Sequence, residues 1–326
     1  MRRLKKISLT LLATLALLIA GGMAYLKFFL PDVGPAPQMK VDLTPERVDR
    51  GRYLAHHVSM CMDCHSKRDW SRFSGPIAEG TLGMGGETFD QSMGFPGVYY
   101  SANITPAGVG RYTDGELFRV ITTGVTKEGK ALFPVMPYHY YGRMDEEDIK
   151  SIIAYLRTLK PIENTVKQSA SDFPMNFILN TFPRKASPEK IPPASDQLAY
   201  GRYMTNASGC MECHTKDNKG QLIAGTEFGG GRAFPLPGGA TVRSSNISPD
   251  KATGIGNWTA EKFVAFFHSR SDSTVLNTTL KPGAFNSIMP WTMYGKMKED
   301  DLRAIYTYLQ TVKPIVNSVD KFVAAR

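Results

Sequence analysis

The sequence predicts a mostly helical protein made of two copies of one domain, preceded by a long apolar segment. Three observations predict this architecture. The chain has 326 residues, enough for two domains with separate cores. A series of short phrases occurs twice in the same order. Apolar residues recur at helical spacing, and no convincing strand alternation is found.

The first thirty residues form a segment of their own. Basic residues in MRRLKK precede Ile7 to Leu26, a run of twenty residues without a charge. A helix of that length crosses a bilayer core of about 30 Å, and the positive-inside rule places the rest of the chain outside the cytoplasm. We expect an uncleaved, single-pass anchor in a bacterial inner membrane, with the globular part in the periplasm. A cleaved signal peptide is the alternative, because Gly22-Met23-Ala24 offers a small-residue cleavage site.

The net charge of +9 does not indicate a nucleic-acid partner. Five of the basic residues lie in the first thirty positions, where there is no acidic residue. The remainder has 34 basic and 30 acidic residues, and it lacks a basic run interleaved with aromatic residues. We therefore expect no binding to nucleic acid.

The internal repeat covers most of the chain after this segment. Its matched phrases are GRY from Gly51 and Gly201, SANITP from Ser101 and SSNISP from Ser244, VMPY from Val135 and IMPW from Ile288, and YGRMDEEDIKSIIAYLRTLKPIENTV from Tyr141 and YGKMKEDDLRAIYTYLQTVKPIVNSV from Tyr294. A tandem duplication of a domain of about 125 residues explains them. We place the domains at residues 31–165 and 194–326.

Three kinds of helix are predicted in each half. Thr44 and Pro45 begin the first kind, with Thr as the N-cap and Pro at the first helical position. Thr113 begins the second with a capping box to Glu116, and its counterpart begins at Thr259. The third is the closing helix, whose apolar residues follow a period of 3.6 residues. They are Ile149, Ile152, Ile153, Leu156 and Leu159, matched by Leu302, Ile305, Tyr306, Leu309 and Val312.

Residues 166–193 join the two domains. Five prolines exclude one continuous helix, and Phe177, Ile178 and Leu179 are too apolar for a free tether. We predict that this linker packs on both domains and fixes the distance between their sites.

All four cysteines lie in two cassettes, CMDCH at 61–65 and CMECH at 210–214. A Cys-x-x-Cys-His cassette attaches one haem through two thioether bonds and supplies the histidine as an iron ligand. Zinc needs four ligands per site, whereas each cassette offers three. A thiol-redox site leaves the histidines unexplained. We therefore predict two covalent haem c groups, bound by Cys61, Cys64 and His65 and by Cys210, Cys213 and His214.

The sixth iron ligands are expected in the loops. Met136 and Met289 recur in register, each before a proline that stiffens the chain, and we expect them to ligate iron. Met144 and Met297 are the rival pair, although packing on the closing helix explains them. The remaining histidines have no partner in the other half, and we expect them at the surface or at a pocket edge: His56, His57, His139 and His268.

With these motifs, both halves resemble class I cytochrome c domains. The phrases that carry the resemblance are CMDCH and CMECH, NITPAGVGRYTDGELF and NISPDKATGIGNWTAEKF, and FPVMPYHYY and IMPWTMY. Between residues 44 and 319 the chain is similar to the membrane-anchored dihaem cytochromes c related to cytochrome subunits of periplasmic alcohol and gluconate dehydrogenases. Those subunits usually carry three haem cassettes, and this chain has two. The resemblance implies His65, Met136, His214 and Met289 as axial ligands, and a crossing of the first and closing helices near Gly51 and Gly201.

These expectations predict a dihaem electron carrier and no enzyme. A haem with both axial positions filled moves single electrons and has no vacant site for a substrate. Two in tandem make a relay between redox partner proteins such as a dehydrogenase, another cytochrome or a terminal oxidase. One alternative is a subunit fixed in a dehydrogenase complex. A dihaem cytochrome c peroxidase is disfavoured, because it needs one haem with an open sixth position and both halves carry the same Met-Pro loop.

Overall fold

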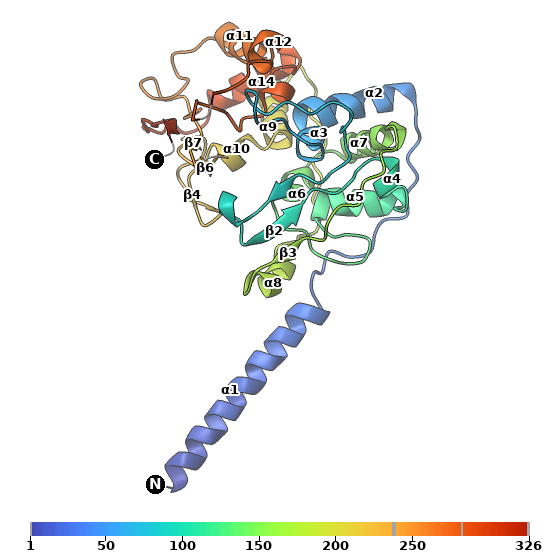
Figure 1. The fold of residues 1–326 in the computed structure, drawn as a ribbon, viewed down its shortest axis with the longest axis vertical. Helices are drawn as coiled ribbons and strands as arrows, with labels where there is room; N and C mark the ends of the chain where they lie inside the picture. Colours follow the sequence, from blue (N-terminus) through green and yellow to red (C-terminus); the bar gives the residue numbers. More distant parts are fainter. Residues whose placement is uncertain (1, 237–238, 282, 325–326) are drawn as a thin grey trace.

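The computed structural model of the chain describes residues 2–236, 239–281 and 283–324, and it is mostly helical. Two globular halves lie against each other, and the long helix α1 (Arg2–Phe28) projects away from them (Figure 1). None of the residues of α1 is buried, and the helix is long and apolar enough to cross a membrane. By length and composition it is either a signal sequence or an anchor.

The two halves contain corresponding helices. The first half contains α2 (Pro45–Tyr53), the π-helical turn η1 (Leu54–Val58), α3 (Cys61–Cys64), the 3-10 turn η2 (Gln91–Met93), α4 (Pro106–Val109), α5 (Asp114–Thr123), α6 (Tyr138–Tyr141) and α7 (Glu146–Thr158). Between the halves lie α8 (Met175–Ile178) and the 3-10 turn η3 (Leu179–Thr181). The second half contains α9 (Gln197–Ala207), α10 (Cys210–Cys213), α11 (Ala260–Arg270), α12 (Ser273–Leu276), α13 (Trp291–Tyr294) and α14 (Glu299–Leu309).

The predicted helix starts are confirmed. Thr44 caps α2 by accepting from the backbone N–H of Arg47, and Pro45 occupies the first helical position. Thr113 and Glu116 make both bonds of the capping box at α5. Thr259 caps α11.

Glycine lets the first and closing helices of each half cross closely. A Cβ atom on Gly51 of α2 would lie 1.8 Å from the carbonyl oxygen of Ser151 in α7. A Cβ atom on Gly201 of α9 would lie 1.9 Å from the carbonyl oxygen of Ala304 in α14. The crossing expected from the resemblance is therefore present twice, and no side chain fits at either crossing.

Short strands, which the sequence did not predict, complete the fold. They are β1 (Thr88–Phe89), β2 (Gly97–Tyr100), β3 (Ala170–Ser171), β4 (Asp217–Asn218), β5 (Gln221–Leu222), β6 (Ala233–Pro235), β7 (Thr241–Arg243) and β8 (Phe322–Val323). The antiparallel sheets have the orders β1-β2-β3, β4-β5 and β6-β7-β8. Strands of two to four residues are too short to show an alternation in the sequence.

Two tyrosines tie the halves together in corresponding ways. Tyr53 at the end of α2 donates its hydroxyl to Asp301 of α14 and accepts the backbone N–H of Lys298 at 3.0 Å. Tyr203 of α9 donates to Asp148 of α7 at 2.7 Å and accepts the backbone N–H of Asp145 at 3.0 Å. Each half therefore places the tyrosine of its GRY phrase at the start of the other half's closing helix.

The segment between the halves lies largely on the first half. Strand β3 pairs with β2. The backbone N–H of Ser187 donates to Gly142 at 2.9 Å, and that of Ile191 donates to the Asp145 carboxylate at 2.9 Å. Glu189 forms ion pairs with Arg143 of the first half at 2.8 Å and with Arg202 of the second half at 3.2 Å. The fixed distance between the sites stays a prediction.

Candidate haem-binding sites

Each cassette forms a single helical turn. A residue in the left-handed region precedes each turn, Met60 with φ 52° before α3 and Gly209 with φ 61° before α10. The i,i+3 spacing places the two thiols of a turn on one face, and all four cysteines are free. The histidine follows as the C-terminal cap of the turn, beside the thiols.

The two cassette histidines are held by the same kind of hydrogen bond. Nδ1 of His65 lies 2.7 Å from the carbonyl oxygen of Ala102, and Nδ1 of His214 lies 2.7 Å from that of Ser245. A carbonyl accepts only from a protonated nitrogen, so Nε2 is left as the atom with a lone pair. Burial lowers the pKa of both histidines, which favours neutral rings at neutral pH. A neutral imidazole with a fixed tautomer suits an axial ligand.

An asparagine in each repeat fixes the segment that provides this carbonyl. Asn103 donates to the carbonyl oxygen of Ile162 at 2.8 Å and accepts from the backbone N–H of Thr105 at 3.0 Å. In the second half Asn246 donates to Ile315 at 2.7 Å and accepts from Ser248 at 2.9 Å. The repeated Asn-Ile-(Thr/Ser)-Pro phrase therefore positions the histidine through its neighbouring carbonyl.

In each half, a glycine-rich loop packs against the cassette histidine and against the segment whose carbonyl accepts from that histidine. The N–H of Gly85 donates to the carbonyl of His65 at 2.8 Å, and the N–H of Gly230 donates to that of His214 at 2.8 Å. Gly85 has φ +70°, and a Cβ atom there would lie 2.4 Å from the carbonyl carbon of Ala102. Glycine is needed at this position both for the backbone conformation and for the space.

The candidate methionine ligands differ in burial from the rival pair. Met136 and Met289 are half-buried, and each precedes a proline and a short helix. Met144 and Met297 are 1% and 2% exposed and belong to the hydrophobic core. Packing therefore accounts for the rival pair, as the sequence suggested. Ligation by Met136 and Met289 stays a prediction.

The residues of the cassettes fit a covalently attached haem better than they fit a thiol-redox site or a zinc site. Burial raises the pKa of Cys61 and Cys64 to about 12, so these thiols do not resemble a reactive redox pair with a low pKa. Among the residues that the structure describes, no three His, Cys, Asp or Glu side chains form a metal-ion cluster. Two thiols on one face, with an Nδ1-anchored imidazole beside them, match the donor set of a haem c site.

The two sites are in contact through their loops. Tyr140 and His139 of α6, just after Met136, approach the Glu212 carboxylate in the second cassette at 3.3 and 3.5 Å. From the first half, the Ser74 hydroxyl donates to the carbonyl of Met289 at 2.6 Å. The loop of each candidate methionine is therefore held partly by the other half.

The sequence did not indicate the contacts that His56 and His57 make. The π-helical turn η1 carries both residues toward the boundary between the halves. Nε2 of His56 lies 2.6 Å from the Tyr155 hydroxyl, and Nδ1 of His57 lies 3.2 Å from the carbonyl of Met293 in the second half. One signal was available, because Gly51 to Cys61 is one residue longer than Gly201 to Cys210. The extra residue falls in the stretch that forms this π-helical turn, and such turns occur mostly as single bulges next to α-helices.

These features together fit a c-type cytochrome. Residues 198–313 match the sequence model of the family Cytochrome c. A "Diheme cytochrome c-type" protein of Cereibacter sphaeroides is 28% identical over 316 residues, covering 94% of this chain and 99% of that protein.

Two further relatives are subunits of dehydrogenases. The "Alcohol dehydrogenase (quinone), cytochrome c subunit" of Gluconacetobacter polyoxogenes is 27% identical over 301 residues, or 86% of this chain. The "Gluconate 2-dehydrogenase cytochrome c subunit" of Pantoea cypripedii is 28% identical over 285 residues, or 81% of this chain. The chain spans 59% of the length of each of these two relatives. By the match to the family model, residues 198–313 belong to the cytochrome c family, and the whole chain is similar to dihaem cytochromes c and to cytochrome c subunits of dehydrogenases.

Proposed function

We propose that this protein relays single electrons through two haem c groups, one in each half. The observation that carries the proposal is the repeated geometry at His65 and His214, where the same Nδ1 bond leaves Nε2 free beside two cysteines. A relative that matches 94% of this chain, named as a dihaem cytochrome, supports the same number of haems.

Each residue type has a defined part in such a relay. The cysteines would hold the porphyrin covalently, and a histidine and a methionine would ligate its iron in each half: His65 with Met136, and His214 with Met289. A bound haem supplies one-electron chemistry with no vacant site for a substrate. The backbone bonds at Ala102 and Ser245 hold the imidazoles in place, which limits their rearrangement when the charge changes.

The contacts between the halves support transfer within one molecule. Glu212 in the second cassette contacts the helix that follows Met136, and Ser74 of the first half holds the carbonyl of Met289. Such contacts would keep the two sites at a constant separation. A relay whose haems keep a fixed distance needs no domain movement for electrons to pass.

We propose that the relay works at the periplasmic face of the inner membrane, anchored by α1. A helix that passes the length and composition test for a membrane span supports an anchor. The donor and acceptor would be redox proteins that dock weakly and exchange quickly. The relatives named as dehydrogenase subunits favour a second candidate, a permanent place in such a complex. Recovery of a dehydrogenase with the protein from solubilised membranes would support this second candidate.

Redox titration of the full chain tests the assignment of the ligands. We expect two haems per chain in the pyridine haemochrome spectrum. Met136→Ala and Met289→Ala should each lower the midpoint potential of one haem, because a thioether ligand raises the potential. Met144→Leu and Met297→Leu are matched controls in the core, and both should leave the potentials unchanged.

Three results would contradict the proposal. A count of one haem per chain would contradict a relay through two haems. Unchanged midpoint potentials in both alanine variants would show that Met136 and Met289 do not ligate iron. Rapid consumption of peroxide by the reduced protein would favour a peroxidase, which needs an open iron position.

A further inference from the structure

The segment between the halves exposes apolar side chains next to the end of α1. Phe173 is 81% exposed and Ile178 is 39% exposed. Phe28 at the end of α1 is 73% exposed and Phe29, which follows it, is 70% exposed. These four side chains come from two parts of the chain that are far apart in the sequence.

The two parts are joined directly. The side-chain amide of Asn180 donates to the carbonyl oxygen of Leu26 at 3.0 Å, in the last turn of α1. Figure 1 shows α8 at the edge of the globular body nearest to α1, whereas α11, α12 and α14 lie on the side away from it. If α1 crosses a bilayer, its last turn reaches the polar surface of that bilayer, and Asn180 places residues 173–185 at the same level.

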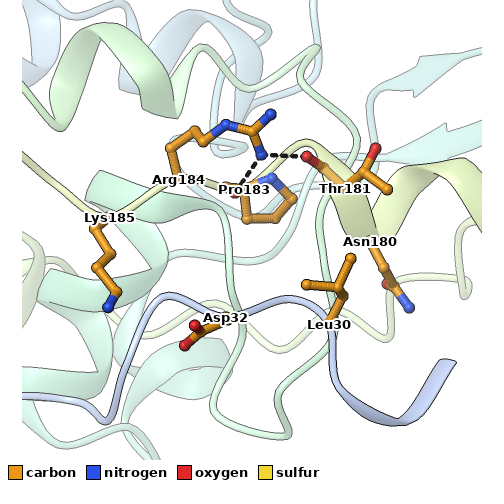
Figure 2. Close-up of a pocket in the computed structure, with 7 residues that line it drawn as sticks. All are labelled: Leu30, Asp32, Asn180, Thr181, Pro183, Arg184 and Lys185. Atoms are coloured by element: carbon orange, nitrogen blue, oxygen red, sulfur yellow. Dashed lines mark hydrogen bonds between the residues drawn. The ribbon is translucent and has the colours of Figure 1, made fainter. Parts of the chain in front are cut away.

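A hollow at this junction has a mixed polar lining. Its volume is about 500 Å³. Figure 2 shows Leu30 and Asp32 lining it together with Asn180, Thr181, Pro183, Arg184 and Lys185. The Arg184 guanidinium donates to the carbonyl oxygen of Pro183 at 3.1 Å and also to that of Thr181. Lys185 and Asp32 add one charge of each sign. Arg184 and Lys185 are exposed and belong to the same segment as Phe173, and segments at a membrane interface typically combine basic and aromatic side chains in this way.

We propose that residues 173–185 are a membrane-interface segment that lies on the bilayer beside the end of α1. Phe173 and Ile178 enter the boundary between headgroups and acyl chains, and Arg184 and Lys185 reach the lipid phosphates. The inference rests on α1 remaining attached as an anchor, as the proposed function has it. A second attachment beside α1 restricts the tilt of the body, so that the first half faces the bilayer and the second half faces the periplasm.

The test measures the depth of Phe173 in the full chain. Phe173→Cys is labelled with a nitroxide and reconstituted into vesicles of phosphatidylethanolamine and phosphatidylglycerol. Val316→Cys is the matched control, because Val316 is also 81% exposed but lies after α14 in the second half. We expect the ratio of oxygen accessibility to nickel-chelate accessibility to be several-fold higher at position 173 than at position 316. Unlabelled wild type should also show slower amide exchange at residues 175–182 in vesicles than in detergent, which covers the case that a cysteine variant fails to fold.

Equal accessibility ratios at the two positions, with no protection of residues 175–182, would overturn the proposal. A mature protein whose mass lacks α1 would overturn it as well. Haem content and midpoint potentials are measured on the same preparations. These two measurements distinguish a failure of the membrane-interface proposal from a failure of the electron relay. A protein without the membrane contact would still bind two haems per chain.

Discussion

At the scale of single residues, a backbone carbonyl holds the imidazole of each cassette: Ala102 accepts from His65 and Ser245 accepts from His214. The sequence predicted the four cysteines, His65 and His214 as haem-binding residues, because covalent attachment of a haem requires the Cys-x-x-Cys-His spacing. It did not indicate that Ala102 and Ser245 would accept from the two imidazoles, since a backbone carbonyl has no sequence signature. The histidines without a counterpart were expected at the surface or at a pocket edge, and His56 is half-buried, with its ring against Tyr155.

His56 predicts a dependence of stability on pH. Burial, and then the charges of His57, Arg52 and Lys296, lower the pKa of His56 to about 4. In the unfolded chain the ring keeps its ordinary value of about 6.5, so between these values only the unfolded chain takes up the proton. Folding stability should therefore fall as the pH drops from about 6.5 to about 4, by on the order of 1–2 kcal/mol after allowance for partial exposure of the ring.

The change that tests this is His56→Gln, which keeps a hydrogen-bonding group toward Tyr155 but cannot titrate. Guanidinium unfolding of wild type and variant is compared at several pH values across this window. We expect a smaller slope of unfolding free energy against pH in the variant. Identical slopes would show that another group causes the dependence.

At the scale of elements, helix starts and buried faces were predictable, and the crossings of helices were not. Caps and apolar periodicity are local, so Thr44, Thr113 and Thr259 predict their helices. The partner of a helix depends on residues about 100 positions away, as between Gly51 and Ser151. Only the resemblance to a family suggested that crossing.

Gly51→Ala should strongly destabilise the first half. The new methyl group would lie 1.8 Å from the carbonyl oxygen of Ser151, so α2 and α7 must separate. Overpacking at a helix contact costs about 3 kcal/mol or more. Thermal unfolding followed by circular dichroism measures the loss. Asp49→Ala on the exposed face of α2 is the control and should change stability by less than about 0.5 kcal/mol.

At the scale of the whole molecule, we expect the two halves to unfold together, because Tyr53 binds Asp301 and Tyr203 binds Asp148 across their boundary. Asp301 and Asp148 are 4% and 5% exposed, so each tyrosine satisfies a buried carboxylate of the other half. Arg50 still binds Asp148 and Tyr200 still binds Asp301 when these tyrosines are replaced, so each change removes one hydrogen bond to a charged group, which is worth about 1.5–3 kcal/mol. The double variant Tyr53→Phe/Tyr203→Phe should therefore unfold in two transitions where the wild type shows one, as calorimetry can measure.

Tyr306→Phe is the matched control for this variant. The Tyr306 hydroxyl donates to the carbonyl of Trp258, a bond of 2.5 Å within the second half. Its loss should lower the stability of that half without separating the transitions. A single transition in the double variant would show that other contacts, such as Glu189 with Arg143 and Arg202, suffice to couple the halves.

The sequence by itself determined the two cassettes, the caps and the apolar helix faces, because each of these depends on residues close together in the chain. It also determined the duplication, because repeated phrases can be compared directly as letters, whatever their separation. Tertiary structure decided which carbonyl holds each histidine, which tyrosine reaches which closing helix, and where residues 173–185 lie beside α1. Those features join segments tens to hundreds of residues apart. Only the packed backbone brings such segments within hydrogen-bonding distance.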